Sequence, residues 1–131
     1  MNYFFSKYKF IFYTLNIILI ILYLFPGSIL GWFFYRNIEL QPQITPDFLV
    51  SSNHLYAFLL LSLIGLFTYK KQNKLSILFK YLLLLALVLE LMHLIIPIRS
   101  FEFSDLFGNL VGVVIVIIIF YFFKKNENSK G

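Results

Sequence analysis

The sequence contains no cysteine and few charged residues, and these two absences exclude several classes of protein. Without cysteine, the chain forms no disulfide and offers no thiolate ligand to a metal. Only 13% of its 131 residues are charged, whereas 60% are hydrophobic and the mean hydropathy is +0.85. A soluble domain is typically about a quarter charged. The composition therefore indicates an integral membrane protein, and its length favours a single domain that covers residues 1–131.

The placement of the positive charge argues against a nucleic-acid partner. The net charge is +5, but the lysines stand beside apolar segments, as cytoplasmic anchors of membrane helices do, and form no basic face. The sequence also lacks a glycine-rich phosphate loop, a serine-centred nucleophile elbow and a paired zinc motif. We therefore expect no nucleic acid, no cofactor and no bound metal, and the motifs assign no catalytic residue.

Four apolar segments have about the length that a membrane-spanning helix needs. They are Phe10–Phe25, Ser52–Tyr69, Ile77–Ile96 and Leu106–Phe123. Each is near the ~20 residues that cross the hydrocarbon core, where the backbone must satisfy its own hydrogen bonds. We therefore predict an all-α membrane protein, built as a bundle of four transmembrane helices. A signal peptide is the alternative for the first segment, although no small-residue cleavage site follows Leu24.

The basic residues also predict the orientation of these helices. The lysines precede the first segment, surround the turn between the second and third, and follow the fourth: Lys7, Lys9, Lys70, Lys71, Lys74, Lys80, Lys124, Lys125 and Lys130. The two other loops, Pro26–Ser51 and Pro97–Asp105, contain only Arg36 and Arg99 as basic residues. By the positive-inside rule, both termini are expected in the cytoplasm and these two loops on the outer side.

Polar residues from several segments are expected to meet near the outer side of the membrane. Ionisable groups are costly in lipid and are seldom there without a role. Glu90 is six residues from the outer end of its segment, which at ~1.5 Å per residue is ~9 Å below that end. Asp105 opens the fourth segment, and Asn109 follows on the same face. The residues expected to form this site are His54, Glu90, His93, Arg99, Asp105 and Asn109.

Structural alternatives exist for these residues. An unpaired Glu90 would cost about 2–4 kcal/mol in the membrane. It is therefore expected to be protonated, paired with Arg99 or His93, or open to a wet cavity, and a Glu90–Arg99 clamp would be purely structural. For Asp105 the alternative is an N-cap of the fourth helix. Asn109 has the alternative role of joining helices, with Gly108 and Gly112 allowing close approach.

A metal site was the remaining alternative for this region. Glu90-x-x-His93 has the spacing of one half of a di-metal site in a helical bundle, but the second half is absent. A single ion held by His54, His93 and a carboxylate is geometrically feasible. The expectation from the sequence nevertheless remains a site without metal.

The stretch from Glu90 to Gly112 resembles the signature of the VanZ-like family of small bacterial membrane proteins. The residues that match in order and spacing are Glu90, Pro97, Arg99, Glu102, Asp105, Asn109 and Gly112. The run His54-Leu55-Tyr56-Ala57-Phe58 is similar to the family's His-Phe-x-x-Tyr element. Two departures are His93, where the family usually has glutamine, and Val50-Ser51, which replaces an Asp-Lys pair.

The resemblance implies a multi-pass protein of the bacterial inner membrane that acts on or near the cell envelope. The family takes its name from a member linked to glycopeptide (teicoplanin) resistance. We expect an outward-facing polar pocket, surrounded by membrane lipids, that binds the head group of an envelope glycan, peptide or lipid-linked ligand. Two alternatives remain open. One is a membrane-embedded enzyme with Glu90 or His93 as general base, and the other is a non-catalytic subunit beside a larger membrane-protein partner.

Overall fold

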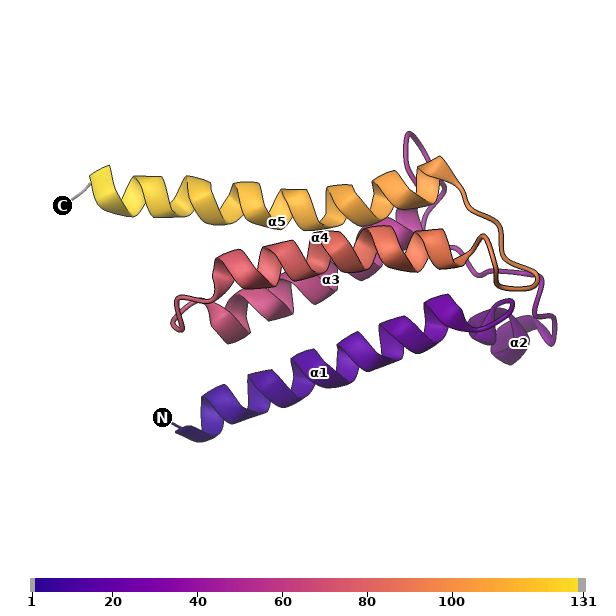
Figure 1. Ribbon diagram of the computed structural model, residues 1–131, viewed down its shortest axis with the longest axis horizontal. Coiled ribbons are helices and arrows are strands. Elements are labelled where there is room, and N and C mark those ends of the chain that lie inside the picture. Colours follow the sequence, from indigo (N-terminus) through magenta and orange to yellow (C-terminus); the bar gives the residue numbers. More distant parts are fainter. Residues whose placement is uncertain (1, 130–131) are drawn as a thin grey trace.

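The computed structural model describes residues 2–129, with side chains described from residue 7 onward, and contains no β-strand in that range (Figure 1). Its helices are α1 (Asn2–Leu24), α2 (Ile29–Tyr35), α3 (Ser52–Tyr69), α4 (Leu75–Met92) and α5 (Phe103–Ser129). All except α2 are long and apolar enough to cross a membrane. The predicted all-α class and its four long apolar helices are confirmed.

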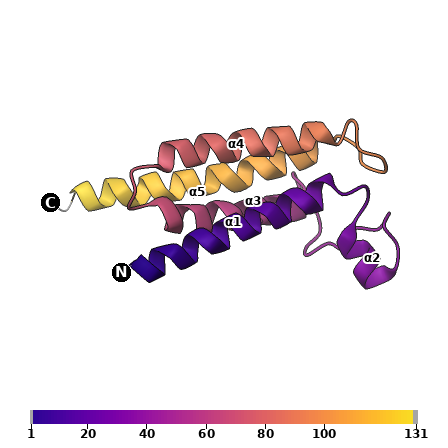
Figure 2. The ribbon, with the colours of Figure 1, turned by 60° about the horizontal axis from the view of Figure 1, so that its bottom comes forward.

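The four long helices lie roughly along one axis, and the short helix α2 sits at one end of them (Figures 1 and 2). This end, which we call the α2 end, also holds the loops 25–51 and 93–102. The N-terminus, the turn between α3 and α4, and the C-terminus lie at the opposite end (Figure 1). Because α3 and α5 both begin at the α2 end, their positive helix-dipole ends face the same region, which favours negative groups there.

The closest packing in the bundle joins α3 and α5, and two glycines make it possible. A Cβ atom on Gly108 would lie 2.7 Å from the Ser51 carbonyl oxygen, and one on Gly112 would lie 2.6 Å from the Leu55 carbonyl oxygen. The backbone amide of Ser51 also donates to the Ser104 carbonyl at 3.1 Å. The two helices therefore touch backbone to backbone, and their first turns are held side by side.

The end of α4 differs from the sequence prediction. The apolar pattern placed the helix at Ile77–Ile96, whereas it ends at Met92. Pro97 explains the difference, because it has no amide hydrogen and its ring would clash with the carbonyl of His93 in a continuing helix. The chain leaves α4 through tight turns, in which the His93 amide donates to the Glu90 carbonyl at 3.1 Å. His93 is thus the helix C-cap rather than a residue inside the last turn.

The start of α5 was also predicted too late in the chain. The helix begins at Phe103 rather than Leu106, and Asp105 belongs to its first turn. The amides of Asp105 and Leu106 both donate to the Glu102 carbonyl, at 3.2 and 3.1 Å. Glu102 therefore occupies the capping position, and the carboxylate of Asp105 is directed at another helix.

The long first loop contains a helix that the sequence did not predict. Ser28 caps α2, since its hydroxyl oxygen accepts a hydrogen bond from the Gly31 amide at 2.9 Å. The helix ends at Tyr35, and its C-cap Arg36 adopts a left-handed conformation with φ of 55°. Four of the side chains exposed along α2 are aromatic: Trp32, Phe33, Phe34 and Tyr35.

Candidate functional site

Polar side chains gather at the α2 end, inside the bundle. The polar cluster consists of Tyr23, His54, Glu90, His93, Asp105 and Asn109, which come from α1, α3, α4, α5 and the start of the 93–102 loop. Only Asp105 has appreciable exposure, with 18% of its side chain open to solvent. The sequence prediction named all of these residues except Tyr23.

His54 and Asp105 form one half of the cluster and join α3 to α5. The Nδ1 atom of His54 lies 3.5 Å from the Oδ1 atom of Asp105 and 2.9 Å from the Ser51 hydroxyl. Both helices start beside each other because Gly108 permits the contact with Ser51. The role of Asp105 thus extends beyond its own helix, since its carboxylate faces an imidazole on α3.

Glu90 and His93 form the other half, and Glu90 is fully buried. One carboxylate oxygen, Oε1, accepts a hydrogen bond from the Glu102 amide at 3.0 Å. The other, Oε2, lies 3.4 Å from His93 Nδ1. His93 Nε2 is 3.0 Å from the Tyr23 carbonyl oxygen. Because a carbonyl only accepts, Nε2 carries the hydrogen, and Nδ1 is the nitrogen that faces Glu90.

Arg99 does not pair with Glu90 in the described structure, so the alternative of a Glu90–Arg99 clamp is absent there, and His93 is the residue that faces Glu90. Its Nη2 atom donates to the Leu22 carbonyl at 2.8 Å, and its Nε atom donates to the Phe25 carbonyl at 3.2 Å. The last carbonyls of a helix lack partners within it and carry partial negative charge, so a guanidinium is favoured at this place. Burial lowers the pKa of Arg99 below the usual arginine value, but arginine remains charged in proteins.

Tyr23 and Asn109 link α1 to α5 deep in the bundle. The Tyr23 hydroxyl donates to Asn109 Oδ1 at 2.7 Å, and both side chains are buried. Asn109 Nδ2 also donates to the Ala86 carbonyl on α4 at 3.5 Å. This matches the helix-joining alternative for Asn109. The sequence offered one signal for Tyr23: it lies seven residues after Asn16, at the same depth as Glu90, on a polar stripe of α1.

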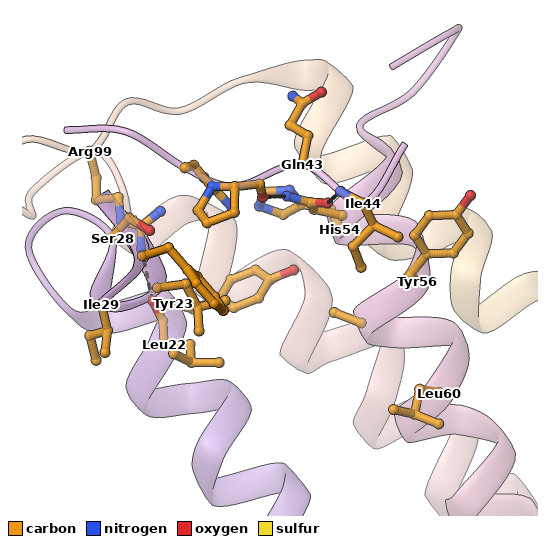
Figure 3. Close-up of a pocket in the computed structure, with 16 residues that line it drawn as sticks. Leu22, Tyr23, Ser28, Ile29, Gln43, Ile44, His54, Tyr56, Leu60 and Arg99 are labelled. Carbon is orange, nitrogen blue, oxygen red and sulfur yellow. Dashed lines mark hydrogen bonds between the residues drawn. The ribbon is translucent and has the colours of Figure 1, made fainter. Parts of the chain in front are cut away.

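A cavity of about 390 Å³ opens beside the cluster, between α1, α2 and α3 (Figure 3). Its walls are mostly apolar, and its polar edge includes His54, Tyr23 and Arg99. Figure 3 shows Leu22 and Arg99 on the α1 side, across from Tyr56 and Leu60 on α3. The lining residues are Leu22, Tyr23, Ser28, Ile29, Leu30, Phe34, Gln41, Pro42, Gln43, Ile44, Asn53, His54, Tyr56, Ala57, Leu60 and Arg99.

The six predicted site residues therefore divide into two groups. His54 and Arg99 line the cavity, whereas Glu90, His93, Asp105 and Asn109 stand behind it. Within the second group, Glu90 and Asp105 remain close to His54: one ligand atom from each of these three residues lies within 4.8 Å of the others. His54 therefore lies between the cavity and the carboxylates of Glu90 and Asp105.

No protein-family model, curated protein or solved structure matches the chain. The resemblance to the VanZ-like family accordingly stands on the motif residues between His54 and Gly112 alone.

Proposed function

We propose that the chain is a VanZ-like, multi-pass protein of the bacterial inner membrane, with the α2 end outside and both termini in the cytoplasm. The four long apolar helices support insertion, and the lysines of the opposite end support the orientation. The exposed aromatic side chains of α2 support a position in the headgroup region, where such residues are enriched.

Because the chain has no cysteine, single cysteines test this orientation directly. Glu39→Cys and Asn126→Cys lie at exposed positions at the two ends of the bundle. A membrane-impermeant maleimide is expected to label the cysteine at position 39 in intact cells, and the one at position 126 only after permeabilisation. The opposite pattern would reverse the proposed topology.

The function that we propose is binding of an anionic, amphipathic envelope molecule, such as a lipid-linked precursor. The cavity carries this proposal, since it combines apolar walls with a cationic edge. Leu22, Ile29 and Leu60 would pack against the lipid part. Arg99 and His54 would bind the head group. Small-molecule sites have this character, with mostly apolar linings and a few placed polar groups.

Arg99 has the chemistry to bind an anionic head group without leaving its present position. A guanidinium has five N–H groups, and the bonds to Leu22 and Phe25 use two of them. The others remain available to a phosphate or carboxylate, for which the planar fork of arginine is suited. The α1 carbonyls thus fix the orientation of the side chain before ligand binds, which reduces the entropy cost of binding.

Two other functions lead to different expectations. In an enzyme with Glu90 or His93 as general base, the base would need to reach the substrate, but neither residue lines the cavity. The geometry therefore favours binding over that reaction. An assembly subunit would bind a larger membrane protein, and a chain that stays monomeric in mild-detergent cross-linking would argue against this role.

A cell-based experiment tests the proposal. We expect Arg99→Ala, at membrane abundance matched to the wild type, to lose an envelope phenotype such as tolerance of teicoplanin. Arg36→Ala is the matched control, because Arg36 is the other arginine at the α2 end and does not line the cavity. A wild-type phenotype in Arg99→Ala would contradict the proposal.

A further inference from the structure

Three side chains from three helices converge in a way that fits a metal ion. His54 on α3, Glu90 on α4 and Asp105 on α5 each offer one ligand atom, and these atoms lie within 4.8 Å of one another. Ligands around one tetrahedral ion at ~2.1 Å lie ~3.4 Å apart. Side-chain movements of about 1 Å would therefore bring the three atoms onto one ion.

The charge at this place also favours a bound cation. Glu90 is fully buried and Asp105 is partly buried. Asp105 faces His54 at 3.5 Å and Glu90 faces His93 at 3.4 Å. Among the side chains that the structure describes, neither carboxylate pairs with a lysine or an arginine. Arg99, the nearest candidate, donates instead to the carbonyls at the end of α1. Two carboxylates in a low-dielectric setting repel each other unless a proton or a cation lies between them.

An independent observation concerns the second oxygen of Glu90. Its Oε2 atom is buried and has no hydrogen-bond partner, and the same holds for His93 Nδ1, which it faces at 3.4 Å. Buried polar atoms in folded proteins are nearly always satisfied, and an exception calls for a specific cause such as a bound ion. The Oε1 atom accepts from the Glu102 amide at 3.0 Å, so the carboxylate is held in place with one oxygen left over.

We propose that His54, Glu90 and Asp105 bind one divalent transition-metal ion. An imidazole nitrogen with two carboxylate oxygens suits ions such as Zn²⁺ or Mn²⁺, and the absence of cysteine removes the softest ligands. This proposal departs from the sequence expectation of a site without metal. Its ligands are His54, Glu90 and Asp105, whereas the sequence suggested His54, His93 and a carboxylate.

The ion would have an open coordination position, and one of its ligands, His54, lines the neighbouring cavity. Three protein ligands are typical of sites that also bind water or substrate, whereas structural zinc sites have four. His54 lines the cavity, so a ligand's anionic group would reach the ion there. His93, which faces Glu90 at 3.4 Å, would be a positioning residue for the Glu90 carboxylate. The proposal goes beyond the proposed function and does not depend on it.

Direct metal analysis tests this proposal. The full chain is purified in detergent with a tag that contains no histidine, loaded separately with Zn²⁺ and Mn²⁺, and dialysed against metal-free buffer. Mass spectrometry of the elements is expected to find about one ion per wild-type chain. His54→Gln and Asp105→Asn should bind the ion at least about 100-fold more weakly. Loss of a residue that only orients a metal ligand already lowers metal affinity by about 10–100-fold.

Asp47→Asn is the matched control for Asp105→Asn. Asp47 also lies at the α2 end, but it is exposed, and its Oδ1 atom accepts from the Ser52 amide at 2.8 Å, a bond that asparagine retains. This variant should hold the metal as the wild type does. Wild-type protein without bound metal, or equal retention by wild type and Asp105→Asn, would overturn the proposal.

Thermal unfolding of the wild type gives a second readout that needs no variant. Zn²⁺ or Mn²⁺ should raise the unfolding temperature by about 5 °C, and a chelator should reverse the shift. No shift with either ion would overturn the proposal even if the variants fail to fold. Both measurements are made without an envelope ligand, so their failure is distinct from a failure of the proposed function.

Discussion

The guanidinium of Arg99 donates from Nη2 to the Leu22 carbonyl oxygen at 2.8 Å and thereby ties the loop after α4 to the end of α1. A second bond, from Nε to Phe25, completes this attachment. The same side chain lines the cavity. One residue therefore fixes the position of α1 and presents a positive charge to a ligand.

Arg99→Lys should lower the free energy of unfolding by about 1–3 kcal/mol. A single ammonium group cannot reproduce the two hydrogen bonds that the guanidinium donates to the Leu22 and Phe25 carbonyls. Unfolding in detergent micelles measures the change. Arg36→Lys is the control, since Arg36 is exposed and only stacks over the Trp32 ring at 5.1 Å. Equal stability of the wild type and Arg99→Lys would show that the attachment contributes little.

Tyr23→Phe should destabilise the bundle by about 0.6–1.7 kcal/mol, the range found for hydrogen bonds between membrane helices. The substitution keeps the ring and removes the donor to Asn109 Oδ1. The free energy of unfolding is compared with that of Tyr121→Phe, which loses a hydroxyl from an exposed side chain. The prediction is wrong if the two variants behave alike.

Gly112→Ala should separate α3 from α5 and cost about 1–3 kcal/mol, as overpacking typically does. The new Cβ would meet the Leu55 carbonyl oxygen and the Leu59 amide nitrogen, which are backbone atoms that cannot move alone. Gly65→Ala provides the comparison, because its Cβ would meet only the ends of Leu78 and Phe12 side chains. A larger loss of stability for Gly65→Ala would contradict this packing account.

Acid should weaken the start of α3 through Asp47. The hydrogen bond from the Ser52 amide lowers the pKa of Asp47 below its usual value of 3.8. A carboxyl group with a lowered pKa in the folded state stabilises above its usual pKa, and this contribution is lost as the pH falls below 3.8. The effect should stay under about 1 kcal/mol because the group is exposed.

Thermal unfolding between about pH 3 and pH 6 checks the Asp47 prediction. Asp47→Asn retains the acceptor oxygen but has no proton to gain. The stability difference between the wild type and this variant should therefore shift in favour of Asp47→Asn as the pH falls. A difference that stays constant over this range would contradict the role of Asp47.

Hydrophobic length was enough to predict the helical class, because a membrane helix depends on long apolar runs rather than on detailed packing. The bounds of α3 agree with the prediction at Ser52–Tyr69. The ends of α4 and α5 do not, since Pro97 and the capping residue Glu102 determine them through local backbone geometry. Helix α2 was missed because a 7-residue helix depends on one capping serine and leaves no clear hydrophobic period.

The site was harder to predict than the helices. The positions of His54, Glu90 and Asp105 along their predicted helices placed them at a similar depth in the membrane. These positions did not predict which charged groups would pair. The sequence allowed either Arg99 or His93 as the partner of Glu90, and the free carbonyls of α1 bind Arg99. Backbone acceptors at helix ends carry no signature in the sequence, so this competition becomes visible only in three dimensions.

Direct ligand binding tests the central claim, that the cavity holds an anionic, amphipathic envelope molecule. Native mass spectrometry of the detergent-solubilised protein measures the binding of a polyprenyl phosphate and of the uncharged polyprenol. We expect the wild type and Arg36→Ala to prefer the phosphate, and Arg99→Ala to bind it at least about tenfold more weakly, a loss of about 1.4 kcal/mol. Equal binding of both lipids by the wild type, or unchanged phosphate binding in Arg99→Ala, would contradict the account.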